Sequence, residues 1–161
     1  MVEVIERTCA LVAMRPGRDA VLAEALAGLG LAVPAMGRFA EGRGVLLARV
    51  APRQMLAMRA GVDGVLMETL GGVAEVAGVI DLSDARAAFR VAGEDARDRL
   101  ALLVPLDLDD DRFPPGSCAA TLLAHTSVLV LRHGTGLFEL QCGRSFAGTV
   151  QDAVDSARAI A

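Results

Sequence analysis

Residues 118–142 read CAATLLAHTSVLVLRHGTGLFELQC, and this stretch decides the fold class. It contains three apolar runs of strand length, Cys118 to Ala124, Ser127 to Arg132 and Leu137 to Cys142. The last two runs are joined by His133–Gly136, a short glycine-containing connection typical of a hairpin. Because a hairpin joins antiparallel strands, the stretch predicts consecutive strands of a mainly antiparallel sheet.

Outward from these strands, apolar spacing predicts further elements on both sides. A C-terminal helix is expected from Ser145 to Ile160, with Ser145 as its N-cap. Upstream in the second half we expect a strand at Arg86–Val91 followed by a helix after Gly93. In the first half we expect, in order, a strand at Ile5–Met14, a helix capped by Asp19, a hairpin of Val45–Val50 with Gln54–Met58, a short helix at Val62–Leu70 and a strand at Val73–Ile80.

The chain has 161 residues, enough for one domain or for two tightly fused half-domains. Each half mixes helices with hairpin strands, which favours an α+β class with mainly antiparallel sheets over a doubly wound parallel sheet. We place an N-terminal α+β half at residues 1–80 and a C-terminal α+β half at residues 81–161, and we expect them to pack as one compact unit.

Composition narrows the function classes. Hydrophobic residues make up 53% of the chain and the net charge is −4, with arginines scattered along it, so a globular protein without a nucleic-acid partner is expected. No run of about 20 mainly apolar residues is present, and Glu3 and Glu6 stand where a signal peptide would be basic and then apolar. With three cysteines far apart, these features predict a cytoplasmic protein with reduced thiols and no membrane segment.

Motifs that would carry chemistry are incomplete. Gly28-Leu-Gly30 follows a predicted helix, which makes it a helix stop and not a dinucleotide fingerprint. Gly143–Gly148 has the strand-to-helix context of a nucleophile elbow around Ser145, but its spacing is one residue too long and both histidines precede the serine. Cys118, Cys142, His125 and His133 lack zinc-ligand spacing, and the aspartates of residues 107–111 lack the offsets of a calcium loop. His125 is interpreted as a core residue.

The loop before Cys118 contains Arg112-Phe-Pro-Pro-Gly-Ser117, which places a large aromatic side chain beside two rigid prolines. Two interpretations stay open at this point. Phe113 can be an exposed docking element on a rigid loop, or it can cover the core of its own domain.

Several segments, in order, resemble the γ subunit of heterotetrameric sarcosine oxidase. They are Pro105–Leu108, Arg112–Ala119, Thr121–His125, Val128–Leu129 and Arg144–Ala147, preceded by Asp81–Ser83 and by the strand through Arg90 with Gly93. The resemblance covers about half of the chain, from Ile80 to Val154, and its motifs are specific in order and spacing. The N-terminal half agrees in its strand-helix outline.

This resemblance implies two ferredoxin-like halves, similar to the folate-binding domain of the glycine-cleavage T-protein and to the N-terminal domain of the tRNA-modification GTPase. It implies a non-catalytic chain whose partners are the α, β and δ subunits, which carry FAD, FMN, NAD, tetrahydrofolate and zinc. Such a complex oxidises the N-methyl group of sarcosine, giving glycine, hydrogen peroxide and formaldehyde or methylene-tetrahydrofolate.

Accordingly, no catalytic, cofactor-binding or metal-binding residue is expected in this chain, and the isolated chain should be inactive. Partner contacts are expected at Arg112, Phe113, Pro114, Pro115, Arg144, Ser145 and Phe146. Three alternatives remain, the γ subunit of a related complex such as N-methylglutamate dehydrogenase, a free-standing folate-binding module, and a small hydrolase that uses Ser145. The second has only five Phe, and no Trp or Tyr, with which to line a pterin pocket.

Overall fold

The computed structural model describes residues 1–157, and the chain divides into two compact units. The amino-terminal unit is Glu6–Asp84, and the carboxy-terminal unit combines Met1–Ile5 with the chain from Ala85 onward. The sequence placed the boundary between residues 80 and 81. Residues 1–5 lie in the carboxy-terminal unit because the strand β1 (Val2–Ile5) pairs antiparallel with β7 (Arg86–Ala92).

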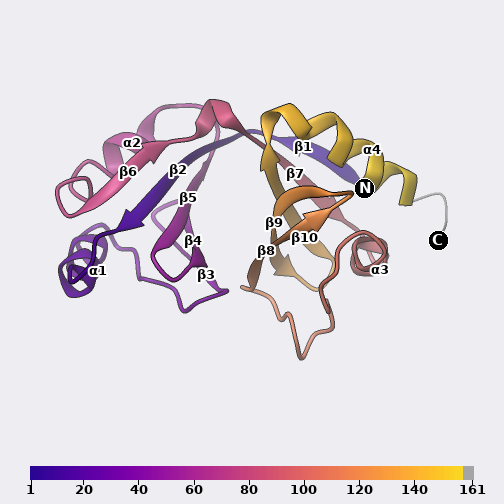
Figure 1. Ribbon diagram of the computed structural model, residues 1–161, viewed down its shortest axis with the longest axis horizontal. Coiled ribbons are helices and arrows are strands. Elements are labelled where there is room, and N and C mark those ends of the chain that lie inside the picture. The colour runs from indigo at the N-terminus through magenta and orange to yellow at the C-terminus, as the bar shows by residue number, and fades with distance from the viewer. Residues whose placement is uncertain (158–161) are drawn as a thin grey trace. The chain divides into compact units, whose positions relative to one another are not determined.

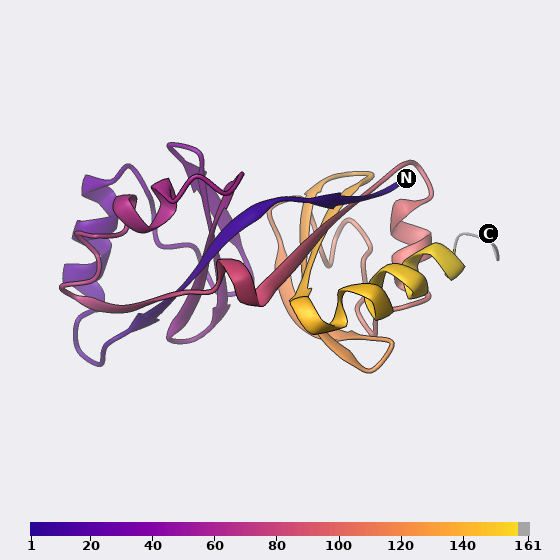
Figure 2. The same ribbon diagram turned by 90° about the horizontal axis from the view of Figure 1, so that it is seen from above.

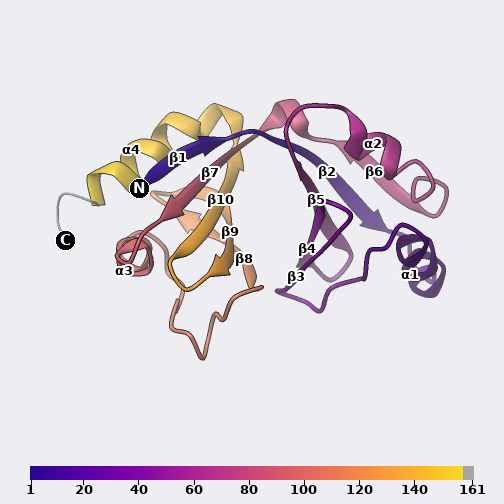
Figure 3. The same cartoon turned by 180° about the vertical axis from the view of Figure 1, so that it is seen from behind.

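The amino-terminal unit is a five-stranded antiparallel sheet in the order β3-β4-β5-β2-β6. Helices α1 and α2 pack on this sheet (Figure 3). One buried apolar cluster joins strand residues such as Leu47 to leucines of the two helices and their ends, namely Leu22, Leu26, Leu66 and Leu70. The elements are β2 (Arg7–Met14), α1 (Asp19–Gly28), β3 (Phe39–Gly42), β4 (Val45–Ala51), β5 (Gln54–Ala60), α2 (Val65–Thr69) and β6 (Ala77–Asp81).

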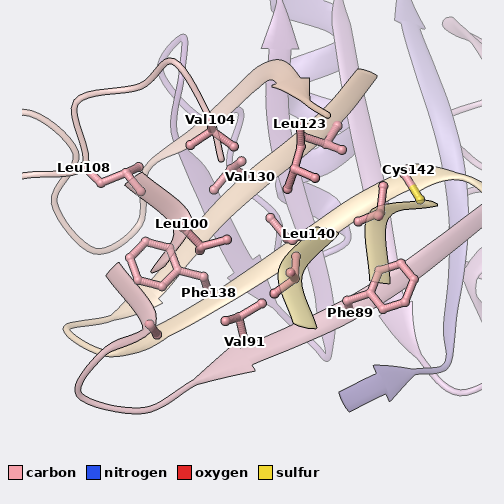
Figure 4. Packing of buried hydrophobic residues seen from close by; sticks show 14 of the residues in the cluster. Phe89, Val91, Leu100, Val104, Leu108, Leu123, Val130, Phe138, Leu140 and Cys142 are labelled. Carbon is pink, nitrogen blue, oxygen red and sulfur yellow. The ribbon is translucent and has the colours of Figure 1, made fainter. Parts of the chain in front are cut away.

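The carboxy-terminal unit is also a five-stranded antiparallel sheet, in the order β1-β7-β10-β9-β8 (Figure 1). Its core joins strand residues such as Phe89 and Leu140 to Leu100 of α3 and Val150 of α4 (the strand side chains and Leu100 are labelled in Figure 4). The remaining elements are the 3-10 helix η1 (Ser83–Ala85), α3 (Ala96–Ala101), β8 (Cys118–Leu123), β9 (Thr126–Gly134), β10 (Leu137–Gly143), the 3-10 helix η2 (Arg144–Phe146) and α4 (Ala147–Ala157).

The two units have the same topology. Strands β3, β4, β5, β2 and β6 take the same places in one sheet as β8, β9, β10, β7 and β1 in the other, and each unit has one helix before its three-strand meander and one after it. The chain is therefore an internal repeat, β1-β2-α1-β3-β4-β5-α2 followed by β6-β7-α3-β8-β9-β10-α4. The first strand of each repeat completes the sheet of the other, and Figure 2 shows the two connections, from β1 to β2 and from β6 to β7.

Matching hydrogen bonds support this repeat. Arg49 of β4 and Arg132 of β9 occupy equivalent positions, each opposite an apolar residue of the following strand beside a register shift. The amide of Gly37 donates to the Arg49 carbonyl oxygen at 3.2 Å, and the amide of Gly116 donates to the Arg132 carbonyl oxygen at 2.7 Å. Both glycines have a positive φ, 73° and 83°. The turn before each meander is therefore built in the same way in both units.

Some local expectations were wrong. Asp19 is the first residue of α1 and does not cap it through its side chain, and the N-cap of α1 is Arg18. Strand β3 was not expected, and the predicted strand Ile5–Met14 is divided between β1 and β2. The C-terminal helix begins at Ala147 after η2, and the part of its predicted range beyond Ala157 lies outside the described residues.

His125 is not a core residue. It is exposed in the two-residue turn between β8 and β9, where Ala124 and His125 have φ values of 47° and 66°. Two consecutive positive φ values are typical of a type I′ turn, which favours Asn-Gly because other side chains are strained there. The equivalent turn between β3 and β4 has Arg43 and Gly44, with φ values of 51° and 74°.

We expect His125→Gly to raise the free energy of unfolding by about 0.5–1 kcal/mol, because glycine relieves strain at a positive φ and this gain exceeds its larger unfolded-state entropy. Chemical denaturation followed by circular dichroism measures the change. Gly44→His, at the equivalent turn, should lower stability. A destabilising effect of His125→Gly would contradict this account of the turn.

Arg99 of α3 is a buried cation in the carboxy-terminal unit. Its side chain is 0% exposed, Nη2 donates to the carbonyl oxygen of Val154 at 2.9 Å, and Nη1 lies 3.9 Å from Oδ2 of Asp95. Within the described part of the chain, Nε and Nη1 have no hydrogen-bond partner. The guanidinium is therefore desolvated with incomplete compensation.

We expect Arg99→Met to leave stability unchanged or to raise it, because an apolar side chain of similar length removes the desolvation cost. Arg99→Ala should instead lower the free energy of unfolding by about 2–4 kcal/mol, since it leaves a cavity between α3 and α4. Thermal and chemical denaturation of both variants make the comparison. Equal losses would show that the guanidinium itself stabilises the unit.

Candidate functional site

The expected partner-contact residues lie in two segments of the carboxy-terminal unit. Arg112–Pro115 belong to the loop between α3 and β8, and Arg144–Phe146 form η2 after β10. Strand register places these segments apart: the loop joins the sheet at Arg132, whereas Cys142, just before η2, is opposite Val128. Four residues of extended strand separate those two points, about 13 Å. The structure therefore does not bring the two segments together at one end of the sheet.

Arg132 organises the loop segment. Its Nη1 donates to the carbonyl oxygens of Phe113 at 2.8 Å and Leu108 at 3.1 Å, and its Nη2 is paired with the carboxylate of Asp110. Nε donates to the carbonyl oxygen of Gly134 at the end of β9, and Nη2 also donates to that of Thr135 in the turn that follows. The guanidinium lies over the ring of Phe138, 5.4 Å from its centroid. The Arg132 side chain is fully buried. One guanidinium therefore fixes both the loop and the hairpin end.

Phe113 covers the core of its own unit. Its side chain is 7% exposed and belongs to the same buried cluster as Leu108 and Phe138. The interpretation of Phe113 as an exposed docking element is wrong for the chain as it stands, because burial of the ring within its own core leaves little apolar surface to offer. Arg112 and Pro115 are the exposed residues of this segment, and Pro114 is half-buried.

The η2 segment is exposed. Arg144, Ser145 and Phe146 all present surface to solvent, and the Phe146 side chain is 51% exposed. Its ring lies against Gly143, where an added Cβ would be 3.4 Å from Cδ2 of Phe146. Ser145 is not an N-cap, since it lies inside η2 and Gly143 occupies the cap position without a side-chain bond. Phe146 is the large apolar side chain that this segment leaves uncovered.

The thiols are buried and separate. Cys118 is opposite Leu131 of β9 and Cys142 is opposite Val128, so the two cysteines lie on different faces of the sheet. Burial raises the pKa of the Cys142 thiol, and the nearby Arg86 partly offsets this effect. Among residues 1–157, no three His, Cys, Asp or Glu side chains are grouped so that they could hold a metal ion.

Sequence analysis missed a polar group on β9 and β10. Glu139 is buried, its Oε1 accepts a hydrogen bond from Nε2 of Gln141 at 2.7 Å, and its Oε2 lies 3.3 Å from Nε2 of His133. Arg90 of β7 is directly opposite Glu139 and lies 3.8 Å from Glu3 of β1. The sequence pattern that could have indicated this polar group is the alternation of side chains along β10, which places Glu139 and Gln141 on the face away from Phe138. The contact of His133 with Glu139 joins β9 to β10 and the Arg90–Glu3 pair joins β7 to β1, whereas the Gln141–Glu139 bond lies within β10.

The fold of this chain is also found in proteins of known structure. No model of a protein family matches the chain, and no curated protein matches its sequence. A chain of heterotetrameric sarcosine oxidase from Corynebacterium sp. U-96, solved in complex with pyrrole 2-carboxylate, is similar with a TM-score of 0.83 and 25% sequence identity, over 98% of this chain and 83% of that chain.

A second likeness is to the glycine cleavage system aminomethyltransferase T from Bartonella henselae, with a TM-score of 0.65 and 16% identity over 97% of this chain. It covers 46% of that protein and shows the fold alone. The predicted α+β class with two antiparallel halves, similar to the glycine-cleavage T-protein, is thereby confirmed.

No helix in the described residues is long and apolar enough to cross a bilayer. Along nearly its whole length, the chain is structurally like a subunit of the heterotetrameric sarcosine oxidase complex.

Proposed function

We propose that this chain is the non-catalytic γ subunit of a flavin-dependent heterotetrameric sarcosine oxidase or of a close relative that acts on another N-methyl amino acid. The observation that carries the proposal is the TM-score of 0.83 with 25% identity across 98% of this chain and 83% of the sarcosine oxidase chain. The order of the sequence motifs between Pro105 and Ala147 supports the same assignment independently.

In this proposal the α, β and δ subunits supply the chemistry. They carry FAD, FMN, NAD, tetrahydrofolate and zinc, and the complex releases glycine, hydrogen peroxide and formaldehyde or methylene-tetrahydrofolate from sarcosine. A scaffold function for this chain is supported by the structural use of its reactive side chains, because the three thiols are buried and Arg132 holds a loop. We place the assembled protein in the cytoplasm.

The proposed contact surface is revised by the geometry. It comprises Arg144, Ser145 and Phe146 of η2 and, separately, Arg112, Pro114 and Pro115 of the loop, with Phe113 as the internal anchor of that loop. A buried anchor fixes the loop backbone before binding, which lowers the conformational entropy lost on association.

Co-expression of the tagged chain with its neighbouring genes tests the proposal. We expect a large yellow complex to co-purify and to oxidise an N-methyl amino acid. A panel containing sarcosine and N-methylglutamate, with oxygen and artificial electron acceptors, distinguishes the oxidase from the related dehydrogenase. A chain that elutes alone and colourless would contradict the subunit assignment. Saturable binding of tetrahydrofolate by that isolated chain would then favour the free-standing folate module.

Phe146→Ser is expected to weaken assembly while leaving the isolated chain folded. A half-exposed aromatic ring adds little to the fold but is typical of an interface residue whose loss costs about 2 kcal/mol, roughly 30-fold in Kd. Titration of the purified partner subunits by biolayer interferometry measures the change. Val62→Ser, at a residue 71% exposed in the amino-terminal unit, serves as the control. Wild-type affinity of Phe146→Ser would remove η2 from the contact surface.

A further inference from the structure

We draw no further inference here: the strongest candidate, the uncharged outer edge of β8 (Cys118–Leu123) with the half-exposed side chain of Leu122, carries none because nothing in the structure shows what covers it.

Discussion

Arg132→Ala is expected to lower the free energy of unfolding of the carboxy-terminal unit by about 3–5 kcal/mol. The substitution removes the donor for the carbonyl oxygens of Leu108 and Phe113 and for the carboxylate of Asp110. Buried carbonyl groups that lose a hydrogen-bond donor retain the cost of desolvation. The loop between α3 and β8 would also lose its attachment to the hairpin end of β9 and β10.

The internal repeat provides a matched control for this experiment. Arg49 occupies the equivalent position, but it is half-buried and donates to the carbonyl oxygens of Pro34 at 3.4 Å and Pro52 at 2.9 Å. Arg49→Ala should therefore cost less, about 1–2 kcal/mol. Because the chain has two compact units, amide hydrogen exchange should be followed strand by strand.

In Arg132→Ala we expect faster exchange in β8, β9 and β10 with little change in β4 and β5. In Arg49→Ala the pattern should be reversed and weaker. Equal losses of unfolding free energy in both variants would contradict the larger role that burial and hydrogen bonds indicate for Arg132. A loss below about 1 kcal/mol for Arg132→Ala would contradict it as well. Arg132→Met separates the hydrogen bonds from the packing of the side-chain stem.

Local pattern predicted much of the fold because hairpins depend on residues that are close in sequence. The three strands of residues 118–142 and the hairpin of β4 with β5 appear where alternation and turn residues place them. The pairing of β1 with β7 could not be predicted in this way, since Val2 and its partner Val91 are far apart in the chain. Periodicity specifies that a strand exists, and it does not specify a distant partner.

The repeat did leave a signal in the sequence. Val45-Leu-Leu-Ala-Arg49 and Val128-Leu-Val-Leu-Arg132 share an apolar strand that ends in arginine before a short turn. Sequence analysis assigned no role to either arginine, and arginine is rarely buried. The carbonyl oxygens of Leu108 and Phe113 and the carboxylate of Asp110 compensate the burial of Arg132, and their positions depend on the folded loop.

The candidate site was predicted less well for a related reason. The sequence shows that Phe113 lies next to prolines in a connecting segment, but it does not show whether the ring points into the core or toward solvent. In the structure the ring of Phe113 joins the core, while Phe146 of η2 remains half exposed. Phe113 and Phe146, which were both expected to contact partners, are therefore expected to behave differently when they are changed.

Phe113→Ala is expected to lower the free energy of unfolding by about 3–5 kcal/mol, the usual cost of removing a buried phenylalanine ring. The loss should appear in the isolated chain, because the ring packs against residues of its own unit. Phe113→Leu, which retains most of the apolar volume, should recover a large part of the stability. Chemical denaturation of the three proteins measures both effects without any partner subunit.

Phe146→Ser completes the comparison, since its stability should stay within about 0.5 kcal/mol of the parent chain. If Phe113→Ala and Phe146→Ser both leave the isolated chain stable and both weaken assembly, the loop would be a docking element and the burial of Phe113 would contribute little to the fold. If Phe113→Ala destabilises the chain and Phe113→Leu restores partner binding along with stability, the ring acts by fixing the loop. In that case partners contact the surface that Phe113 supports, and they do not contact the ring.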